Sequence, residues 1–528
     1  MRTRNIAILG VAALALAAAA QQSGDQIRLP ATRGGEAQLS FLRGVTALHN
    51  FAYEEALLQF RAAQKLDADF AMAYWGEAMA HNQTLWLNQD RDAARAALLR
   101  LAATPEERAR KAGSEKEKGL LAAVEILYGI GEKPARDQAY ARGMAALHAR
   151  HPDDLGLAAF HALALLGTAV RSPALFSEGN EEAHQHALVG SETQRQVAAI
   201  LDAVLRANPS HPGALHYTIH NYDDPEHARL ALPAARGYAK AAPESSHALH
   251  MPAHIFVQLG NWDEAAASDE ASFAQSIAWV RRRGLGIGFR DFHSLSWLCY
   301  EALQQGRFQK ARETLTLIQP AVAETGAARL KALQSVMRAQ YVIETRSWEM
   351  LRGQSSFDTS AELFAIGIGA AETGLSQVAT LARNELRRRS QNQKLDAVIM
   401  EKEVGAVLAL REGRGGEAAT LIQEAVVLEE TLPPPLGPPR PIKPASELQG
   451  ELLLALERPR EAAGAFTRAL ARWNNRSASL LGLARATAAS GDREASRKHY
   501  QRLLANWSRA DGDLSGIAEA RRAVAGAK

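Results

Sequence analysis

A short phrase that recurs along the chain is the feature that most limits its fold. The phrase runs glycine, any residue, often an aromatic residue, two more residues and then alanine, and apolar residues follow it at helical spacing. Gly260, Gly306, Gly374 and Gly413 each begin a copy, and Phe51 stands in the glycine position of an early copy. Glycine permits a tight reversal of the chain. The phrase therefore predicts antiparallel helix pairs joined by short turns.

The small and aromatic residues in these copies have a regular spacing. Towards the end of the chain, Gly450 and Ala462 are twelve positions apart, and Phe466 and Ala469 follow. Small residues let paired helices approach closely, and an aromatic ring fills the gap between them. One pair cannot bury its apolar face alone, so neighbouring pairs stack. The pattern resembles the tetratricopeptide repeat and predicts an all-α, right-handed superhelix (solenoid) of tetratricopeptide-type antiparallel helix pairs.

The composition agrees with a soluble repeat protein. The 528 residues are too many for one compact core. Hydrophobic and charged contents of 47% and 23% are ordinary for a soluble protein. The net charge is +3, and basic residues alternate with acidic ones, which argues against a nucleic-acid partner. Cys299 is the single cysteine, so an intramolecular disulfide is excluded and a core position is expected for it.

The first residues have the pattern of an export signal. Arg2 and Arg4 precede an apolar run that extends from Ile6 to Ala20, where small residues offer a cleavage site. The run is shorter than the roughly 20 residues of a membrane-spanning helix. We expect residues 1–20 to be a cleaved signal peptide, the mature chain to be periplasmic or secreted, and no transmembrane segment to follow.

Changes in composition divide the rest of the chain. Residues 21–36 are polar, residues 37–170 hold the first repeat and further helices, and residues 171–430 hold central repeats and a histidine cluster. Residues 431–444 are rich in proline and predict a stiff, extended linker. Residues 445–528 are expected to form the last repeats and a capping helix.

Histidines are concentrated in two phrases of the central block. The members of each pair, His216 with His220 and His250 with His254, are four residues apart, so on a helix they share a face. Imidazole is the commonest protein ligand for zinc, copper and iron. The candidate ligands are His216, His220, His247, His250, His254 and His293. Candidate carboxylates that would orient them or act beside them are Glu77, Asp223, Asp224 and Glu244.

Pro252 leaves the geometry of the second phrase open. Inside a helix it would remove one backbone hydrogen bond and bend the axis between His250 and His254. In a first helical turn it would instead leave His247 and His250 in the preceding loop. The sequence is compatible with both arrangements.

Several phrases resemble a group of exported bacterial tetratricopeptide proteins whose role is poorly defined. They are Ala73–Ala80, His216–His220, His250–Ile255 and Leu448–Leu454, and the resemblance extends from about residue 39 to residue 507. It implies a shared architecture and a common site for these phrases, and it implies no reaction. The chain departs from the group at Asn82–Trp86, which lacks an expected His-Pro pair.

Two functional hypotheses follow. The repeats favour a binding or scaffold protein, not an enzyme, that holds a peptide, a partner protein or a small ligand in a concave groove. The alternative is a metalloprotein with zinc, copper or iron between adjacent helices. With Glu77 or Asp224 near an open coordination position, it would be a redox or hydrolytic enzyme. The first hypothesis predicts dispersed histidines. The second predicts ring nitrogens within about 4 Å of each other.

Overall fold

The computed structural model describes residues 29, 31–171, 185–186, 190–351, 359–392, 394–512, 514 and 516–526. The described residues fall into two units. The first lies within residues 1–172, 184–222 and 233–251, and the second within residues 173–183, 223–232 and 252–528. The predicted signal peptide, residues 1–20, lies outside the described residues. No described helix combines the length and the apolar character needed to cross a bilayer.

The first unit is almost entirely helical, and its two strand pairs are antiparallel and only two residues long. The boundary between the units falls inside α12 and α13. In chain order the elements are α2 (Gly35–His49), α3 (Tyr53–Leu66), α4 (Ala71–Ala80), β1 (Asn82–Gln83), η1 (Thr84–Trp86), β2 (Asn88–Gln89), α5 (Arg91–Leu101), α6 (Pro105–Lys111), α7 (Glu115–Leu127), α8 (Lys133–Arg150), α9 (Leu155–Ala169), β3 (Val170–Arg171), β4 (Gln185–His186), α10 (Glu192–Ala207), α11 (Pro212–Asn221), α12 (Ala228–Ala241) and α13 (Ser246–Leu259).

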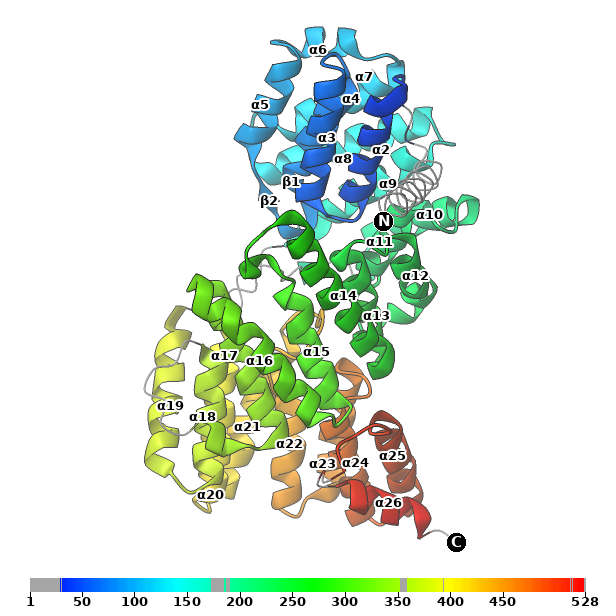
Figure 1. Ribbon diagram of the computed structural model, residues 1–528. Coiled ribbons are helices and arrows are strands. Elements are labelled where there is room, and N and C mark those ends of the chain that lie inside the picture. Colours follow the sequence, from blue (N-terminus) through cyan, green and yellow to red (C-terminus); the bar gives the residue numbers. More distant parts are fainter. Residues whose placement is uncertain are drawn as a thin grey trace, which may run out of the picture. The chain divides into compact units, whose positions relative to one another are not determined.

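The second unit continues with helices that pack against their neighbours in the sequence, as Figure 1 shows for α18, α19 and α20. In chain order its elements are α14 (Trp262–Arg283), η2 (Ile287–Phe289), α15 (Phe292–Gln304), α16 (Phe308–Thr325), α17 (Ala328–Thr345), η3 (Trp348–Leu351), α18 (Ser360–Glu372), α19 (Ser376–Arg389), η4 (Ser390–Asn392), α20 (Leu395–Arg411), α21 (Gly415–Glu430), α22 (Ala445–Ala455), α23 (Pro459–Arg472), α24 (Ser477–Ala489), α25 (Arg493–Asn506) and α26 (Ile517–Ala525).

Glycines in successive helices make room for one aromatic ring. Phe60 of α3 is fully buried, and its ring lies between Gly44 of α2 and Gly76 of α4. A Cβ atom at Gly44 or Gly76 would come within 2.6 Å or 2.3 Å of that ring. The close approach explains why the pattern alternates small and aromatic residues.

The same packing recurs near the end of the chain. Phe466 of α23 lies between Gly450 of α22 and Gly482 of α24, and a Cβ atom at either glycine would approach its ring to 2.7 Å or 2.2 Å. The turns at Gly260 and Gly306 have positive φ angles of 67° and 68°, as the tight reversal requires. The predicted all-α architecture of tetratricopeptide-type helix pairs is confirmed.

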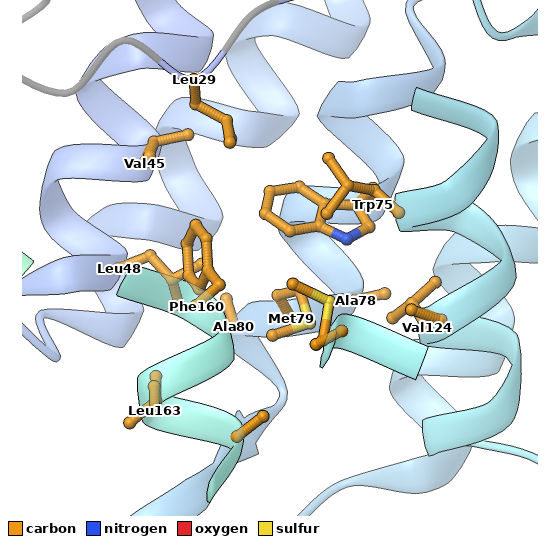
Figure 2. Close-up of a cluster of buried hydrophobic side chains, with 14 of the residues drawn as sticks. Leu29, Val45, Leu48, Trp75, Ala78, Met79, Ala80, Val124, Phe160 and Leu163 are labelled. Atoms are coloured by element: carbon orange, nitrogen blue, oxygen red, sulfur yellow. The ribbon is translucent and has the colours of Figure 1, made fainter. Parts of the chain in front are cut away.

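The core of the first unit is built around an aromatic pair. The indole of Trp75 on α4 meets the phenyl ring of Phe160 on α9 edge to face, with ring centroids 5.4 Å apart (Figure 2). Leu48 of α2 and Leu163 of α9 lie in the same apolar cluster. The imidazole of His49, the last residue of α2, stacks on the ring of Phe160 with centroids 4.5 Å apart. The core therefore holds the end of α2 in place.

A buried charge network joins the inner helices of the second unit. Arg476, next to the start of α24, is 1% exposed. Its guanidinium donates to Glu447 of α22 at 2.7 Å and 3.0 Å, and to Glu344 of α17 at 2.5 Å. Paired charges of this kind are stable in an interior only when their hydrogen bonds are satisfied. The network ties these helices to one another.

Residues 431–444 contain no helix, as the prolines predict, but they do not mark the boundary between the two units. They pack within the second unit, where Leu432 and Ile442 are buried. The main-chain oxygen of Pro435 accepts a hydrogen bond from Gln258, and a Cβ atom at Gly437 would touch the indole of Trp297. This segment is thus a packed part of the unit as well as a connection.

Cys299 lies in the apolar core formed by α14 to α17, as expected from its neighbours in the sequence. Burial raises the pKa of its thiol to about 12. A thiol with so high a pKa carries almost no thiolate at neutral pH. Its position agrees with a packing role.

A buried carboxyl pair in the second unit makes stability depend on pH. Asp269 of α14 and Glu301 of α15 are fully buried and close enough for their charges to interact. Burial raises the pKa of Asp269, helped by the charge of Glu301, and burial raises the pKa of Glu301 to about 8. The native state therefore binds more protons than the unfolded state between about pH 4.5 and pH 8.

The unfolding free energy is expected to fall across that window, by up to about 1.4 kcal/mol per pH unit for each proton retained. The variant Glu301→Gln should show a shallower fall, because one titrating group is lost and the side chain keeps nearly the same size. Urea denaturation between pH 5 and pH 8 measures the slope. Glu385→Gln is the control, because Arg388 holds the pKa of Glu385 at about 2, below the window. Equal slopes for wild type and Glu301→Gln would contradict the prediction.

Candidate histidine site

Helix α11 carries the first histidine pair because of the residues at its start. His211 is buried at the N-cap, where its Nδ1 accepts a hydrogen bond from the main-chain N–H of Ala214 at 3.2 Å. Pro212 occupies the first helical position, which its fixed φ suits. The helix then places His216 and His220 one turn apart on a shared face.

Helix α13 carries three of the other candidates. It extends from Ser246 to Leu259, with Pro252 inside it. His247 and His250 are therefore helical, and the alternative that placed them in a preceding loop is wrong. The Oγ of Ser245 accepts the main-chain N–H of Ala248 at 3.2 Å and supports the first turn.

Three imidazoles of the first unit converge on one point. The Nε2 of His216 lies 3.1 Å from the Nε2 of His220 and 3.1 Å from the Nε2 of His247. One ring nitrogen from each histidine lies within 4.8 Å of the other two. The two residues on α11 and the one on α13 thus form a three-histidine site, which we define as His216, His220 and His247.

The tautomer of His216 is set by a main-chain carbonyl. Its Nδ1 lies 2.7 Å from the carbonyl oxygen of His49. A carbonyl oxygen can only accept, so Nδ1 carries the proton and donates it. In the neutral ring the Nε2 then holds an in-plane lone pair, directed at the other two histidines. His49 itself is held by Tyr217, whose hydroxyl lies 2.9 Å from its Nδ1.

Aromatic side chains surround the three histidines. The ring of Phe51 lies 4.3 Å from that of His216 and 5.7 Å from those of His220 and His247, centroid to centroid. The indole of Trp86 lies 5.7 Å from His247. Trp86 belongs to the phrase that lacks the expected His-Pro pair, so this end of the first repeat contributes an aromatic wall and not a ligand.

The three histidines differ in their exposure to solvent. His216 is 0% exposed and His220 is 2% exposed, whereas His247 is half-buried. Buried imidazoles need partners for both nitrogens. Of the three residues, His247 is thus the one in contact with solvent.

Two further candidates lie together in the second unit. The Nδ1 of His254 is 2.6 Å from a carboxylate oxygen of Asp223, and Gln258 donates to the other oxygen at 3.0 Å. The indole of Trp297 packs against His254 at 4.5 Å and against His293 at 5.4 Å. Asp223 therefore lies in hydrogen-bond contact with His254, and the sequence hypothesis that it orients a metal-binding histidine stays a prediction.

The remaining candidates have other positions. Glu77 is buried, and its carboxylate forms ion pairs with Arg61 and Arg100, so its charge serves the helix packing of the first repeat. Asp224 accepts main-chain N–H groups at the start of α12 and contacts the ring of His227 at 2.9 Å. Glu244 is exposed just before α13. His250 is buried on α13, one turn before His254.

Sequence reasoning missed three contributors to the three-histidine site. They are the carbonyl of His49 and the rings of Phe51 and Trp86. The substitution of phenylalanine for the turn glycine at position 51 was a visible signal. No sequence pattern could point to the carbonyl of His49, because every residue has a main-chain carbonyl.

Solved repeat structures are similar to this chain at low identity. Yeast Tom70 is 13% identical, with 87% of this chain and 90% of that chain covered and a TM-score of 0.31. A human IFIT1 dimer with PPP-AAAA is 12% identical, with 92% and 94% covered and a TM-score of 0.34. A tetratricopeptide repeat protein from Parabacteroides merdae is 12% identical, with 53% and 98% covered and a TM-score of 0.28.

No family model and no curated protein matches the chain. TM-scores this low carry no argument about its ligands or partners. The assignment of the fold rests on the protein's own helix pairs, positive-φ turns and ring-between-glycines packing. By these features the chain is an all-α repeat protein of tetratricopeptide type, with three converging imidazoles in its first unit.

Proposed function

We propose that the protein binds a divalent transition-metal ion through His216, His220 and His247. The observation that carries the proposal is the pair of 3.1 Å separations between Nε2 atoms. Nitrogens bound at about 2.0–2.1 Å to one tetrahedral ion lie roughly 3.3–3.4 Å apart. The two separations from His216 are therefore within a few tenths of an ångström of those expected around one ion, and all three nitrogens lie within 4.8 Å of one another.

Hydrogen bonds among the rings explain this arrangement less well. The Nε2 of His216 has a single in-plane lone pair, because its Nδ1 donates to the carbonyl of His49. Two other Nε2 atoms approach that lone pair at the same distance. One of them can donate to it with good geometry, but not both. A cation accepts a lone pair from all three rings at once.

Three imidazoles suit zinc, copper, iron or nickel. With three imidazoles as ligands, a four-coordinate ion would keep one position for another ligand. An ion with an open position can bind a water molecule or another small ligand and polarise it. The proposal extends to metal binding and to such an exogenous ligand, and it assigns no reaction.

The test is metal binding by the chain from residue 21 onward, purified without an affinity tag. Titration with Co²⁺, followed by visible absorption and equilibrium dialysis, counts the tight sites. The variant His216→Ala/His220→Ala should bind one equivalent fewer than wild type. Wild type without tight binding of Co²⁺, Zn²⁺ or Cu²⁺ would refute the proposal.

A second histidine pair in the first unit provides the matched control. The Nδ1 atoms of His148 and His161 also lie 3.1 Å apart, but among the described residues no third metal ligand joins them. The variant His148→Ala/His161→Ala removes the same number of imidazoles. It is expected to keep the full number of tight equivalents. If His148→Ala/His161→Ala binds one equivalent of Co²⁺ fewer and His216→Ala/His220→Ala does not, the metal ion is not bound at the three-histidine site.

A glycine beside His49 allows an indirect test. A Cβ atom at Gly213 would lie 2.3 Å from the Nδ1 of His49, so Gly213→Ala must displace that residue. The carbonyl that orients His216 would move with it. We expect Co²⁺ affinity to fall by about 10- to 100-fold, the usual effect of losing an orienting partner. Competition with a chromophoric chelator measures the change, and unchanged affinity would contradict the orienting role of His49.

Two sequence hypotheses remain proposals. Export of the chain rests on the pattern of residues 1–20, and cell fractionation with N-terminal sequencing of the mature protein tests it. A peptide or protein partner rests on the repeat fold. In the second unit the ion pairs of Arg476 join α17, α22 and α24 to one another, so a partner groove there would have to lie outside these contacts.

A further inference from the structure

The turn before α3 differs from most turns of its kind. Among the described residues, the residue two positions before an α-helix has a positive φ at the starts of α3, α8, α10, α14, α16, α17, α19, α21, α23, α24 and α25. Eight of these eleven residues are glycines, with φ between 61° and 105°. The exceptions are Phe51 at 53°, Glu457 at 57° and Asn475 at 57°. A bulky residue with positive φ is strained, because its Cβ atom crowds the backbone.

The strained residue at position 51 has a specific set of contacts. Phe51 is only 7% exposed, and its ring contacts the rings of all three histidines of the site. Strain persists where the surrounding structure requires it, and an observed outlier is a reason to look for a function. A glycine at position 51 would relieve the strain, but it would remove the aromatic ring that packs against His216, His220 and His247.

We infer that Phe51 is a positioning residue of the three-histidine site. Its ring limits the rotation of the imidazoles and keeps water away from the buried side of the bound ion. The half-buried ring of His247 also lies beside the indole of Trp86. This inference rests on the proposed function, since it assigns the side chain a role toward a metal ion.

The inferred role concerns only the ion's surroundings. Phe51 has no atom that could coordinate the ion, so its removal keeps all three ligands. A merely structural side chain would change the stability of the fold and leave the ion's coordination as it is. A positioning side chain changes the affinity and the coordination of the ion in a folded protein.

Co²⁺ binding to Phe51→Gly, Phe51→Leu and Glu457→Gly distinguishes these roles. Glu457→Gly is the matched control, because it relieves the same backbone strain in another turn of the second unit. We expect Phe51→Gly to bind Co²⁺ at least about 10-fold more weakly. Its visible absorption should weaken as water enters and the coordination number rises. Phe51→Leu should restore much of the intensity, and Glu457→Gly should match wild type.

The outcomes separate this inference from the proposed function. Wild type without tight Co²⁺ binding would refute the metal site and the inference with it. Wild type that binds Co²⁺, together with a folded Phe51→Gly of the same affinity and spectrum, would overturn the inference and leave the metal site intact. If Phe51→Gly does not fold, Phe51→Leu decides. A leucine variant identical to wild type in affinity and spectrum would then reduce the role to filling space, against the inference.

Discussion

Replacing His216 with alanine is expected to weaken Co²⁺ and Zn²⁺ binding more than replacing His220 or His247. His216 is the central ligand, because its Nε2 lies 3.1 Å from both other nitrogens. Its ring is also held in the ligand tautomer by the carbonyl of His49. The loss should exceed the 10- to 100-fold effect of removing an orienting partner, so we expect at least about 1,000-fold. Competition titration with a chelator of known affinity measures it.

The other two ligands should follow in the order of their burial. His220 is buried, so its loss leaves a gap that water must fill from inside the protein. His247 is half-buried, and a water molecule can replace its ring at smaller loss. His148→Ala serves as control, with unchanged affinity expected. Equal effects of the three single substitutions would show that the ligands contribute alike, against the central role of His216.

Replacing Gly482 with alanine is expected to destabilise the second unit, although alanine favours helices. A Cβ atom at Gly482 of α24 would lie 2.2 Å from the ring of Phe466, which is fully buried between two helices. Forcing extra volume into a packed core costs about 1–3 kcal/mol, and sometimes more. The gain in helix propensity, about 1 kcal/mol, does not offset this. Thermal and urea unfolding measure the net loss.

Gly464→Ala should change stability in the opposite direction. Gly464 lies in α23 and is exposed. A Cβ atom there would lie 3.9 Å from Nη1 of Arg468, which is an ordinary contact distance. The same substitution there reduces the freedom of the unfolded chain without a clash, which stabilises by about 0.4–1 kcal/mol. A destabilising Gly464→Ala, or a neutral Gly482→Ala, would contradict the ring-between-glycines account.

Local patterns in the sequence predicted most of the fold. The periodic small and apolar residues around Phe60 and Phe466 indicate helices, and the turn glycines indicate where pairs reverse. These features depend on residues within one or two helical turns of each other. The proline-rich residues 431–444 illustrate the limit of such reasoning. Their lack of helix is a local property, whereas their packing within the second unit depends on residues such as Gln258 and Trp297.

The sequence by itself determined that the chain forms helix pairs and that His216 and His220 share a face of one helix. Tertiary structure decided which imidazoles meet. His247 joins them from α13, and His254 lies against Asp223. The carbonyl of His49 and the ring of Phe51, more than 160 residues earlier in the chain, complete the three-histidine site. Helical periodicity depends on residues that are close in the sequence. Contacts between distant helices depend on how every intervening helix pair packs, and no local sequence pattern encodes the combined effect of that packing.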